Sequence, residues 1–233
     1  MRLLTFLLIS VFSALSAVKS SAAETLQAGT AAIETSPQVT PFRLRSGKST
    51  LVHDPLHARA VAFQNGEGRV VITLIDAIGI GREETDDVKA RAAKITGWKP
   101  EEMLISATHS HTTPKVGGED PGSVAYKTKR FNGMLNAITT AITNLEPARV
   151  GFGSDEEPTE VRNRRWYMAP GKMPPNPFGK MDIVKMNPSR SPDVLDRPAG
   201  PTDPDITVIS IQDVRRKQLA LFAKRKMVRQ HKN

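Results

Sequence analysis

Two histidines separated by a single residue follow an apolar run in this chain. The run is Met103–Ala107, and the histidines are His109 and His111. In an extended backbone alternate side chains share a face, so both imidazoles are expected on one side at the exit of a strand. They can share a metal ion, or one can bind it while the other polarises a substrate. The alternative is a polar turn with two exposed histidines.

The absence of cysteine from the sequence restricts which metals such a site could hold. Thiolate ligands and a cysteine nucleophile are excluded, so the ligands must be His, Asp, Glu or Tyr. These donors suit zinc or a harder divalent cation. Without disulfides, the fold must depend on a hydrophobic core, for which a chain of 233 residues is long enough.

The histidine pair stands at the end of a predicted strand–helix–strand unit. Residues 59–64 and 70–75 flank an Asn-Gly-Glu-Gly turn and predict a hairpin. The second strand is nearly all apolar, so we expect it to be covered on both faces. A helix over 83–95, ended by Gly97, then leads into the strand Met103–Ala107. This crossover favours parallel pairing, which gathers ligands at the carboxyl ends of the strands.

Asp76 is a second candidate site residue, because it ends the 70–75 strand as His109 follows the next one. If the two strands are parallel, both residues lie on one edge of the sheet. Asp76 could then orient an imidazole from the second shell or ligate the metal itself. A cap on the following turn is an equally good interpretation.

The remaining elements predict an α/β fold with a mixed β-sheet core and flanking helices. A first strand spans 27–34, and apolar residues at helical spacing predict a helix over 131–145. Strands follow at 148–152 and 205–211. Between them, residues 154–204 hold ten of the seventeen prolines. We expect this long proline-rich loop excursion to be ordered and to cross the active-site edge.

The two ends of the chain differ in composition from its middle. Residues 1–23 combine an arginine, an apolar stretch and small residues, which predicts a signal peptide and a secreted or periplasmic protein without a transmembrane anchor. Residues 214–233 carry eight basic side chains and no acid, which accounts for most of the net charge of +9. The domain between them, 24–213, is near neutral, so no nucleic-acid binding is expected. The basic tail is expected to be disordered, or to make peripheral contact with an anionic surface.

Several motifs in order resemble one known family. The motifs are Ala28-Gly29-Thr30, His57-Ala58-Arg59-Ala60, the apolar strand ending in Asp76, the segments 105–111 and 144–150, and Asn163-Arg164-Arg165. In this order and spacing they resemble the N-terminal catalytic domain of the neutral/alkaline non-lysosomal ceramidase family, closest to divergent exported bacterial members. The resemblance covers roughly residues 27–220.

The resemblance implies zinc-dependent hydrolysis of an N-acyl amide, with a ceramide-like sphingolipid or another small-molecule amide as substrate. It makes His109 a zinc ligand and His111 a catalytic hydrogen-bonding partner in the active site. It assigns Asn163 and Arg164 to the substrate site, where the Arg164 guanidinium could also stabilise a developing oxyanion.

The family completes its zinc site beyond the strand at 206–211, with another histidine and, further on, a glutamate and a tyrosine. From Leu221 onward the sequence departs from the family pattern, and His231 is its only remaining histidine. We therefore expect a truncated, incomplete domain with an aberrant basic tail, in which hydrolysis is impaired or lost. The alternative is an exported ligand-binding or surface-associated protein without catalysis.

Overall fold

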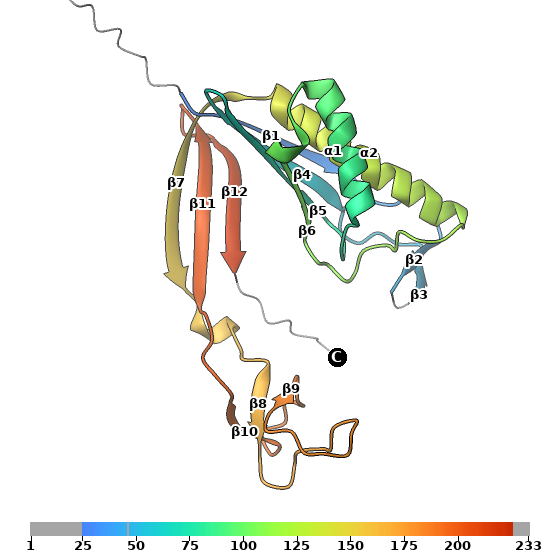
Figure 1. Cartoon of the computed structure of the whole chain (residues 1–233), viewed down its shortest axis with the longest axis vertical. Coiled ribbons are helices and arrows are strands. Elements are labelled where there is room, and N and C mark those ends of the chain that lie inside the picture. Colours follow the sequence, from blue (N-terminus) through green and yellow to red (C-terminus); the bar gives the residue numbers. More distant parts are fainter. Residues whose placement is uncertain (1–24, 46, 226–233) are drawn as a thin grey trace, which may run out of the picture.

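The structure is a computed structural model that describes residues 25–45 and 47–225. Its main feature is a seven-stranded mixed sheet with the strand order β12-β11-β7-β1-β4-β5-β6, accompanied by two α-helices (Figure 1). This arrangement confirms the predicted α/β class. The signal peptide predicted over 1–23 lies outside the described residues, and the predicted domain boundaries stay predictions. No described helix is long and apolar enough to cross a membrane.

The sheet is built around the predicted hairpin. Strand β4 (His57–Asn65) turns at Gly66 and Glu67 into β5 (Gly68–Ile75), and the two pair antiparallel along their length. Gly66 has a φ of 57°, the left-handed conformation that such a turn requires. Strand β1 (Gln27–Glu34) pairs antiparallel with β4 on its other side.

The predicted crossover is also present. Helix α1 (Arg82–Thr96) ends at Gly97, which has a φ of 74° and donates its N–H to the Ala93 carbonyl. The chain then enters β6 (Met103–Ala107), which pairs parallel with β5. The carboxyl ends of β5 and β6 therefore meet at one edge of the sheet, as expected.

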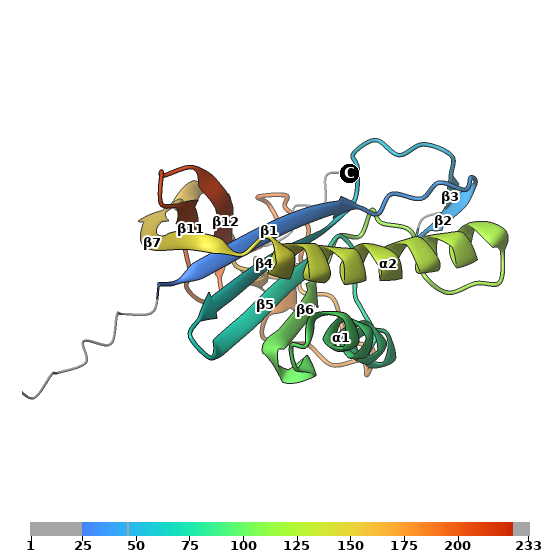
Figure 2. The same ribbon diagram turned by 90° about the horizontal axis from the view of Figure 1, so that it is seen from above.

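Helix α2 (Pro121–Thr143) lies across β1, β4 and β5 and begins ten residues before the predicted start. Its first turn is stabilised by the Asp120 side chain, which accepts from the Ser123 N–H at 3.0 Å. Residues 121–130 lack apolar periodicity because their buried positions include Gly122, Ser123 and Arg130, and the arginine is buried in an ion pair. Both helices cover the same face of the sheet (Figure 2).

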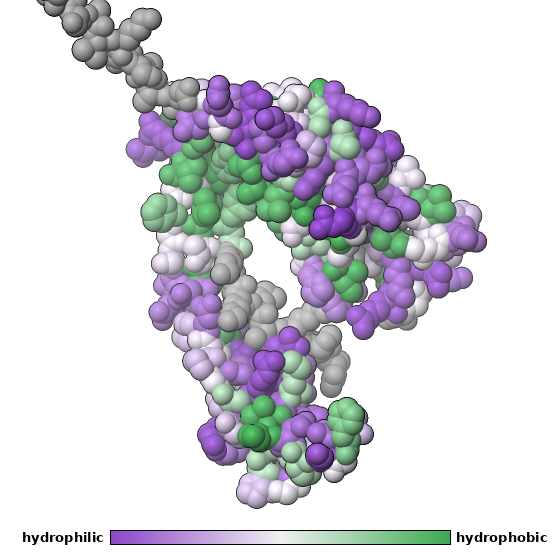
Figure 3. All heavy atoms as spheres, viewed as in Figure 1, coloured by the Kyte–Doolittle hydropathy of each residue, from purple (hydrophilic) through white to green (hydrophobic). Residues whose placement is uncertain are grey.

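The expectation that the 70–75 strand is covered on both faces is wrong. Val71, Thr73 and Ile75 are buried beneath the helices, whereas Ile72 and Leu74 are only half-buried. The hydrophobic core lies between the sheet and the helices and includes Ala58, Ala60, Met134, Ala137 and Ile138. Apolar residues also show at the surface of the main sheet (Figure 3).

Three long strands continue the sheet beyond β1. Strand β7 (Glu146–Glu156) pairs with β1 only near its start and then runs beside β11 (Asp205–Asp213). Strand β12 (Gln218–Arg225) pairs antiparallel with β11. Part of the segment 214–233, which we expected to be a disordered tail, is thus a strand, because apolar residues such as Leu219 pack there. Residues 226–233 lie outside the described part of the chain.

The proline-rich segment is ordered, as predicted, but instead of crossing the edge where β5 and β6 end it extends from the far end of β7 and β11, where it carries a small sheet of its own (Figure 1). Its strands are β8 (Arg165–Met168), β9 (Lys185–Met186) and β10 (Leu195–Pro198). No residue between 158 and 203 is buried. The other short elements are β2 (Phe42–Leu44), β3 (Gly47–Ser49), η1 (Pro100–Glu102) and η2 (Pro158–Glu160).

Candidate active site

The histidine pair lies in the turn that leaves β6, at the edge where β5 and β6 both end. Backbone pairing with the segment after β5 continues into this turn: Thr108 donates its N–H to the Ile75 carbonyl and Ser110 to the Ala77 carbonyl. His109 itself adopts a left-handed conformation, with φ of 61°. The turn, rather than an extended strand, therefore sets the direction of the imidazoles.

The tautomer of His109 follows from its partner. Its Nδ1 lies 2.7 Å from the Ile78 carbonyl oxygen, which can only accept a hydrogen bond. Nδ1 is therefore the donor, and in the neutral ring the lone pair is on Nε2. A backbone carbonyl on one ring nitrogen is the usual partner of a histidine that ligates metal through the other.

His111 approaches His109 closely enough for both to bind one ion. The two Nε2 atoms are 3.5 Å apart, and the rings meet edge to face with centroids 5.0 Å apart. Two zinc–nitrogen bonds of about 2.0–2.1 Å at a tetrahedral angle place their nitrogens roughly 3.3–3.4 Å apart. The pair thus fits two positions of one zinc ion. Within residues 25–45 and 47–225, no cluster of three or more histidine and carboxylate side chains could hold a metal.

Asp76 lies on the predicted edge, but its carboxylate has partners of its own. Its Oδ2 accepts from Nη1 of Arg59 at 2.8 Å and from the His57 N–H at 2.9 Å. The group that orients His109 through Nδ1 is the Ile78 carbonyl. Sequence reasoning missed both Arg59 and this carbonyl; the signal for Arg59 was a charge in the middle of an otherwise alanine-rich strand.

A buried ion pair supports the loop that holds His109. Nη2 of Arg130, on α2, donates to Glu84 of α1 at 2.7 Å and to the Gly79 carbonyl at 3.1 Å. The Arg130 side chain is only 1% exposed. Gly79 adjoins Ile78, so this arginine fixes the loop beside the carbonyl that orients His109. An arginine on an amphipathic helix gives no sequence signal for such a role.

Asn163 and Arg164 lie together at the start of β8. The Asn163 amide donates to the carbonyls of Gly200 and Pro201, and its oxygen accepts from the Arg165 N–H. Asn163 therefore ties the two ends of the small sheet together. Nε of Arg164 donates to Asn187 Oδ1 at 3.0 Å, a partner that sequence reasoning missed.

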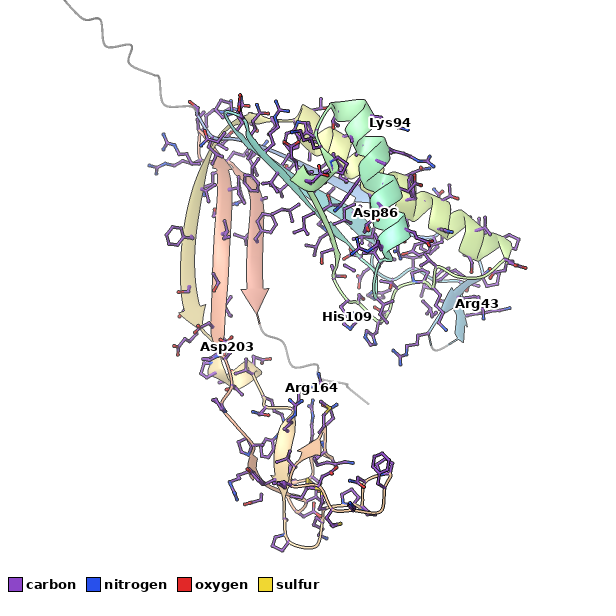
Figure 4. All side chains as sticks on the ribbon, in the orientation of Figure 1. Arg43, Asp86, Lys94, His109, Arg164 and Asp203 are labelled. Carbon is purple, nitrogen blue, oxygen red and sulfur yellow. The ribbon has the colours of Figure 1, made fainter. Side chains whose placement is uncertain are left out.

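Asn163 and Arg164 line a small pocket that is separate from the two histidines. Residues 161–165 and 201–203 line a pocket of about 190 Å³. His109 and Arg164 lie on opposite sides of an open space between the main sheet and the small sheet (Figures 3 and 4). The structure thus brings the two histidines together, and Asn163 together with Arg164, but it holds these two pairs on different sheets.

Comparison with known proteins gives a likeness at the level of the fold. No protein-family model matches the sequence, and no curated protein matches it. Among solved structures, the chain is similar to a neutral ceramidase from Pseudomonas aeruginosa and to a ceramidase complexed with C2. Each is 19% identical with a TM-score of 0.60, and the match covers 86% of this chain and 31% of the other. The chain thus spans about a third of the length of these ceramidases and shares their fold over that part.

Proposed function

We propose that this chain carries part of a zinc-dependent amidohydrolase site whose substrate class is an N-acyl amide of the ceramide type. The observation that carries the proposal is the histidine pair, with its Nε2 atoms 3.5 Å apart and His109 oriented through Nδ1 by a carbonyl. The likeness to solved ceramidases supports the choice of substrate class.

His109 would hold zinc through Nε2, and His111 either shares the ion or donates a hydrogen bond to the substrate. When bound, zinc lowers the pKa of a water molecule to about 7 and polarises a carbonyl. The 2.7 Å bond to the Ile78 carbonyl would keep the His109 proton on Nδ1 and leave the Nε2 lone pair available to the ion.

Arg164 would bind the amide oxygen through its terminal nitrogens, while Nε stays on Asn187. A planar guanidinium can donate two N–H bonds that converge on such an oxygen and can stabilise charge that develops on it. Asn163 would act at this site by holding the backbone beside Arg164. Because the arginine lies across open space from His109, this role requires the small sheet to approach the main sheet when substrate binds.

We expect zinc binding to be weak and hydrolysis to be impaired in this chain. A catalytic zinc usually has three protein ligands, and the histidine pair provides two. Weak binding still differs from none, because two correctly spaced imidazoles lower the dissociation constant well below that of a single exposed histidine.

Calorimetric titration of the purified chain with zinc tests the metal site. We expect binding at one site per chain that is lost in His109→Asn, because asparagine keeps the left-handed backbone but removes the imidazole. His53→Asn is the matched control, since His53 is exposed in a loop. Equal zinc binding by the wild type and both variants would refute the assignment of His109.

Release of fatty acid from an N-acyl amide, measured with and without zinc, tests the substrate class. We expect slow, zinc-dependent turnover that falls in Arg164→Gln and is unchanged in Arg190→Gln, an exposed arginine of the same segment. Turnover that does not depend on zinc would exclude the proposed chemistry.

A further inference from the structure

Three large apolar side chains are exposed near the middle of the proline-rich segment. Phe178 is 87% exposed, Ile183 81% and Met181 61%. We call these three residues the apolar tip. Exposed apolar side chains are ordinary when scattered singly, but a group of them marks a site of contact with a protein or a membrane.

The turn that carries the apolar tip is held by its own hydrogen bonds. Asn176 Oδ1 accepts from the N–H groups of Phe178 and Lys180, both at 3.0 Å, and Asn176 donates its own N–H to the Lys180 carbonyl at 2.7 Å. Gly179 has a φ of 75°, which suits this tight turn. The backbone of the turn is therefore ordered before any partner arrives, so docking requires little further ordering of it.

The segment that carries the apolar tip is basic overall, with one acid, Asp182, between Met181 and Ile183. Residues 161–200 contain eight arginines and lysines and three aspartates. Lys172 precedes the turn and Lys180 lies in it, and both are exposed. Apolar side chains flanked by lysine and arginine are complementary to a lipid surface with anionic headgroups.

We propose that the apolar tip inserts into the interface of a membrane that contains anionic lipid, with the exposed Lys172 and Lys180 on the headgroups. The small sheet lies at one end of the long axis of the molecule (Figure 1), and the three tip residues are exposed on the segment that forms it. A projecting turn fits a bilayer better than it fits a second protein surface, which would have to offer a matching groove. This docking goes beyond the proposed hydrolysis and requires neither zinc nor the histidines.

Cosedimentation with vesicles tests the docking. The full chain is mixed with vesicles of phosphatidylcholine alone or of equal parts phosphatidylcholine and phosphatidylserine. We expect binding to the mixed vesicles that weakens as salt is raised. The substitution of Ser for all three residues of the apolar tip should lower the partition coefficient at least about tenfold, and Lys180→Gln about fivefold.

Matched controls come from the same chain. Phe152 on β7 is 89% exposed, so Phe152→Ser removes an equally exposed phenyl ring from another part of the surface. Lys94 lies on α1, away from the small sheet (Figure 4), and Lys94→Gln removes one positive charge. Both controls should bind vesicles as the wild type does.

A single introduced cysteine reports insertion directly, because the chain has no other. Phe178→Cys and Phe152→Cys are each labelled with an environment-sensitive fluorophore. We expect mixed vesicles to shift the emission of the label at 178 to the blue and to leave the label at 152 unchanged.

Two results would overturn the proposal. One is vesicle binding that is equal in the wild type and the triple serine variant. The other is a wild type that does not bind vesicles but self-associates in sedimentation velocity, with the association lost in the triple variant. That second result would assign the apolar tip to a contact between two copies of the chain.

Discussion

At position 109 the backbone conformation restricts the residue type independently of the role of the imidazole. The residue has a φ of 61°, and for a residue with a β-carbon the left-handed conformation costs roughly 1–2 kcal/mol relative to the right-handed one. Glycine adopts it freely and asparagine tolerates it, whereas alanine does not.

We therefore expect His109→Ala to unfold at a free energy about 1 kcal/mol below that of His109→Gly. His109→Asn should fall between them, because its short polar side chain is tolerated in this conformation. Urea denaturation of the three variants measures the order. Equal stability in all three would mean that the turn relaxes to an ordinary conformation when the imidazole is removed.

Asp120 gives the stability of the fold a pH dependence that can be isolated. Hydrogen bonds from the Ser123 hydroxyl and N–H hold the pKa of Asp120 below its usual value. The ionised carboxylate thus stabilises the folded chain above the unfolded pKa of about 3.9, and this contribution is lost as the pH falls through the lower folded pKa.

Asp120→Asn tests this, because asparagine also caps helices but does not titrate. We expect the melting temperature of the wild type to exceed that of the variant at neutral pH and the difference to shrink below about pH 4. A difference that stays constant across the acid range would mean that the ionisation of Asp120 does not contribute to the stability of the fold.

The proximity of the histidines could be predicted from the sequence, but the geometry that produces it could not. An i, i+2 spacing after a strand predicts a shared face, and the Nε2 atoms are indeed 3.5 Å apart. They meet, however, because His109 turns into a left-handed conformation after β6 has ended. The Ile78 carbonyl acts from another loop, and no local pattern identifies which backbone group will reach a ring.

At the scale of elements, the ion pair between α1 and α2 supports both the helix packing and the loop beside His109. Arg130 is 1% exposed and Glu84 15%. Removing one partner of a buried pair leaves an uncompensated charge, which costs about 3–5 kcal/mol, whereas replacing both by apolar residues is often neutral.

We expect Arg130→Met to destabilise the chain by about 3 kcal/mol and Glu84→Leu combined with Arg130→Met to recover most of that loss. Zinc affinity should fall in Arg130→Met and should not recover in the double variant. In both, the Gly79 carbonyl has lost its donor and the adjoining Ile78 is no longer fixed. Guanidinium denaturation and zinc titration measure the two effects. Recovery of zinc affinity along with stability would restrict the arginine to a packing role.

The elements themselves were predictable where local patterns were unopposed. The hairpin turn at Gly66 and Glu67, and Gly97 at the end of α1, each determine a local conformation. Helix α2 was predicted only from residue 131, because a buried arginine breaks the apolar pattern in its first half. Strand β12 was not predicted, because basic residues flank its apolar positions in the sequence. Only its pairing with β11 shows which of its positions are covered.

At the scale of the whole molecule, the proline-rich segment behaves as an insertion into the β7–β11 pair. The strands on either side continue to pair from Ala148 with Asp213 to Glu156 with Asp205. Just beyond, Glu157 donates its N–H to the Pro204 carbonyl at 2.9 Å, so the segment leaves and returns at one point. Because no residue between 158 and 203 is buried, the segment contributes little to the core.

Replacing residues 158–203 by a short glycine–serine linker should therefore leave the main sheet folded. We expect the melting temperature to change by less than about 4 °C, the shift that roughly 1 kcal/mol produces in a domain of this size. Zinc binding by the histidine pair should persist, since both histidines lie on the main sheet, whereas binding to mixed vesicles should be lost with the apolar tip. Circular dichroism, zinc titration and cosedimentation of the shortened chain measure the three properties. Loss of the folded sheet would mean that the small sheet stabilises β7 and β11 through contacts beyond their shared hydrogen bonds.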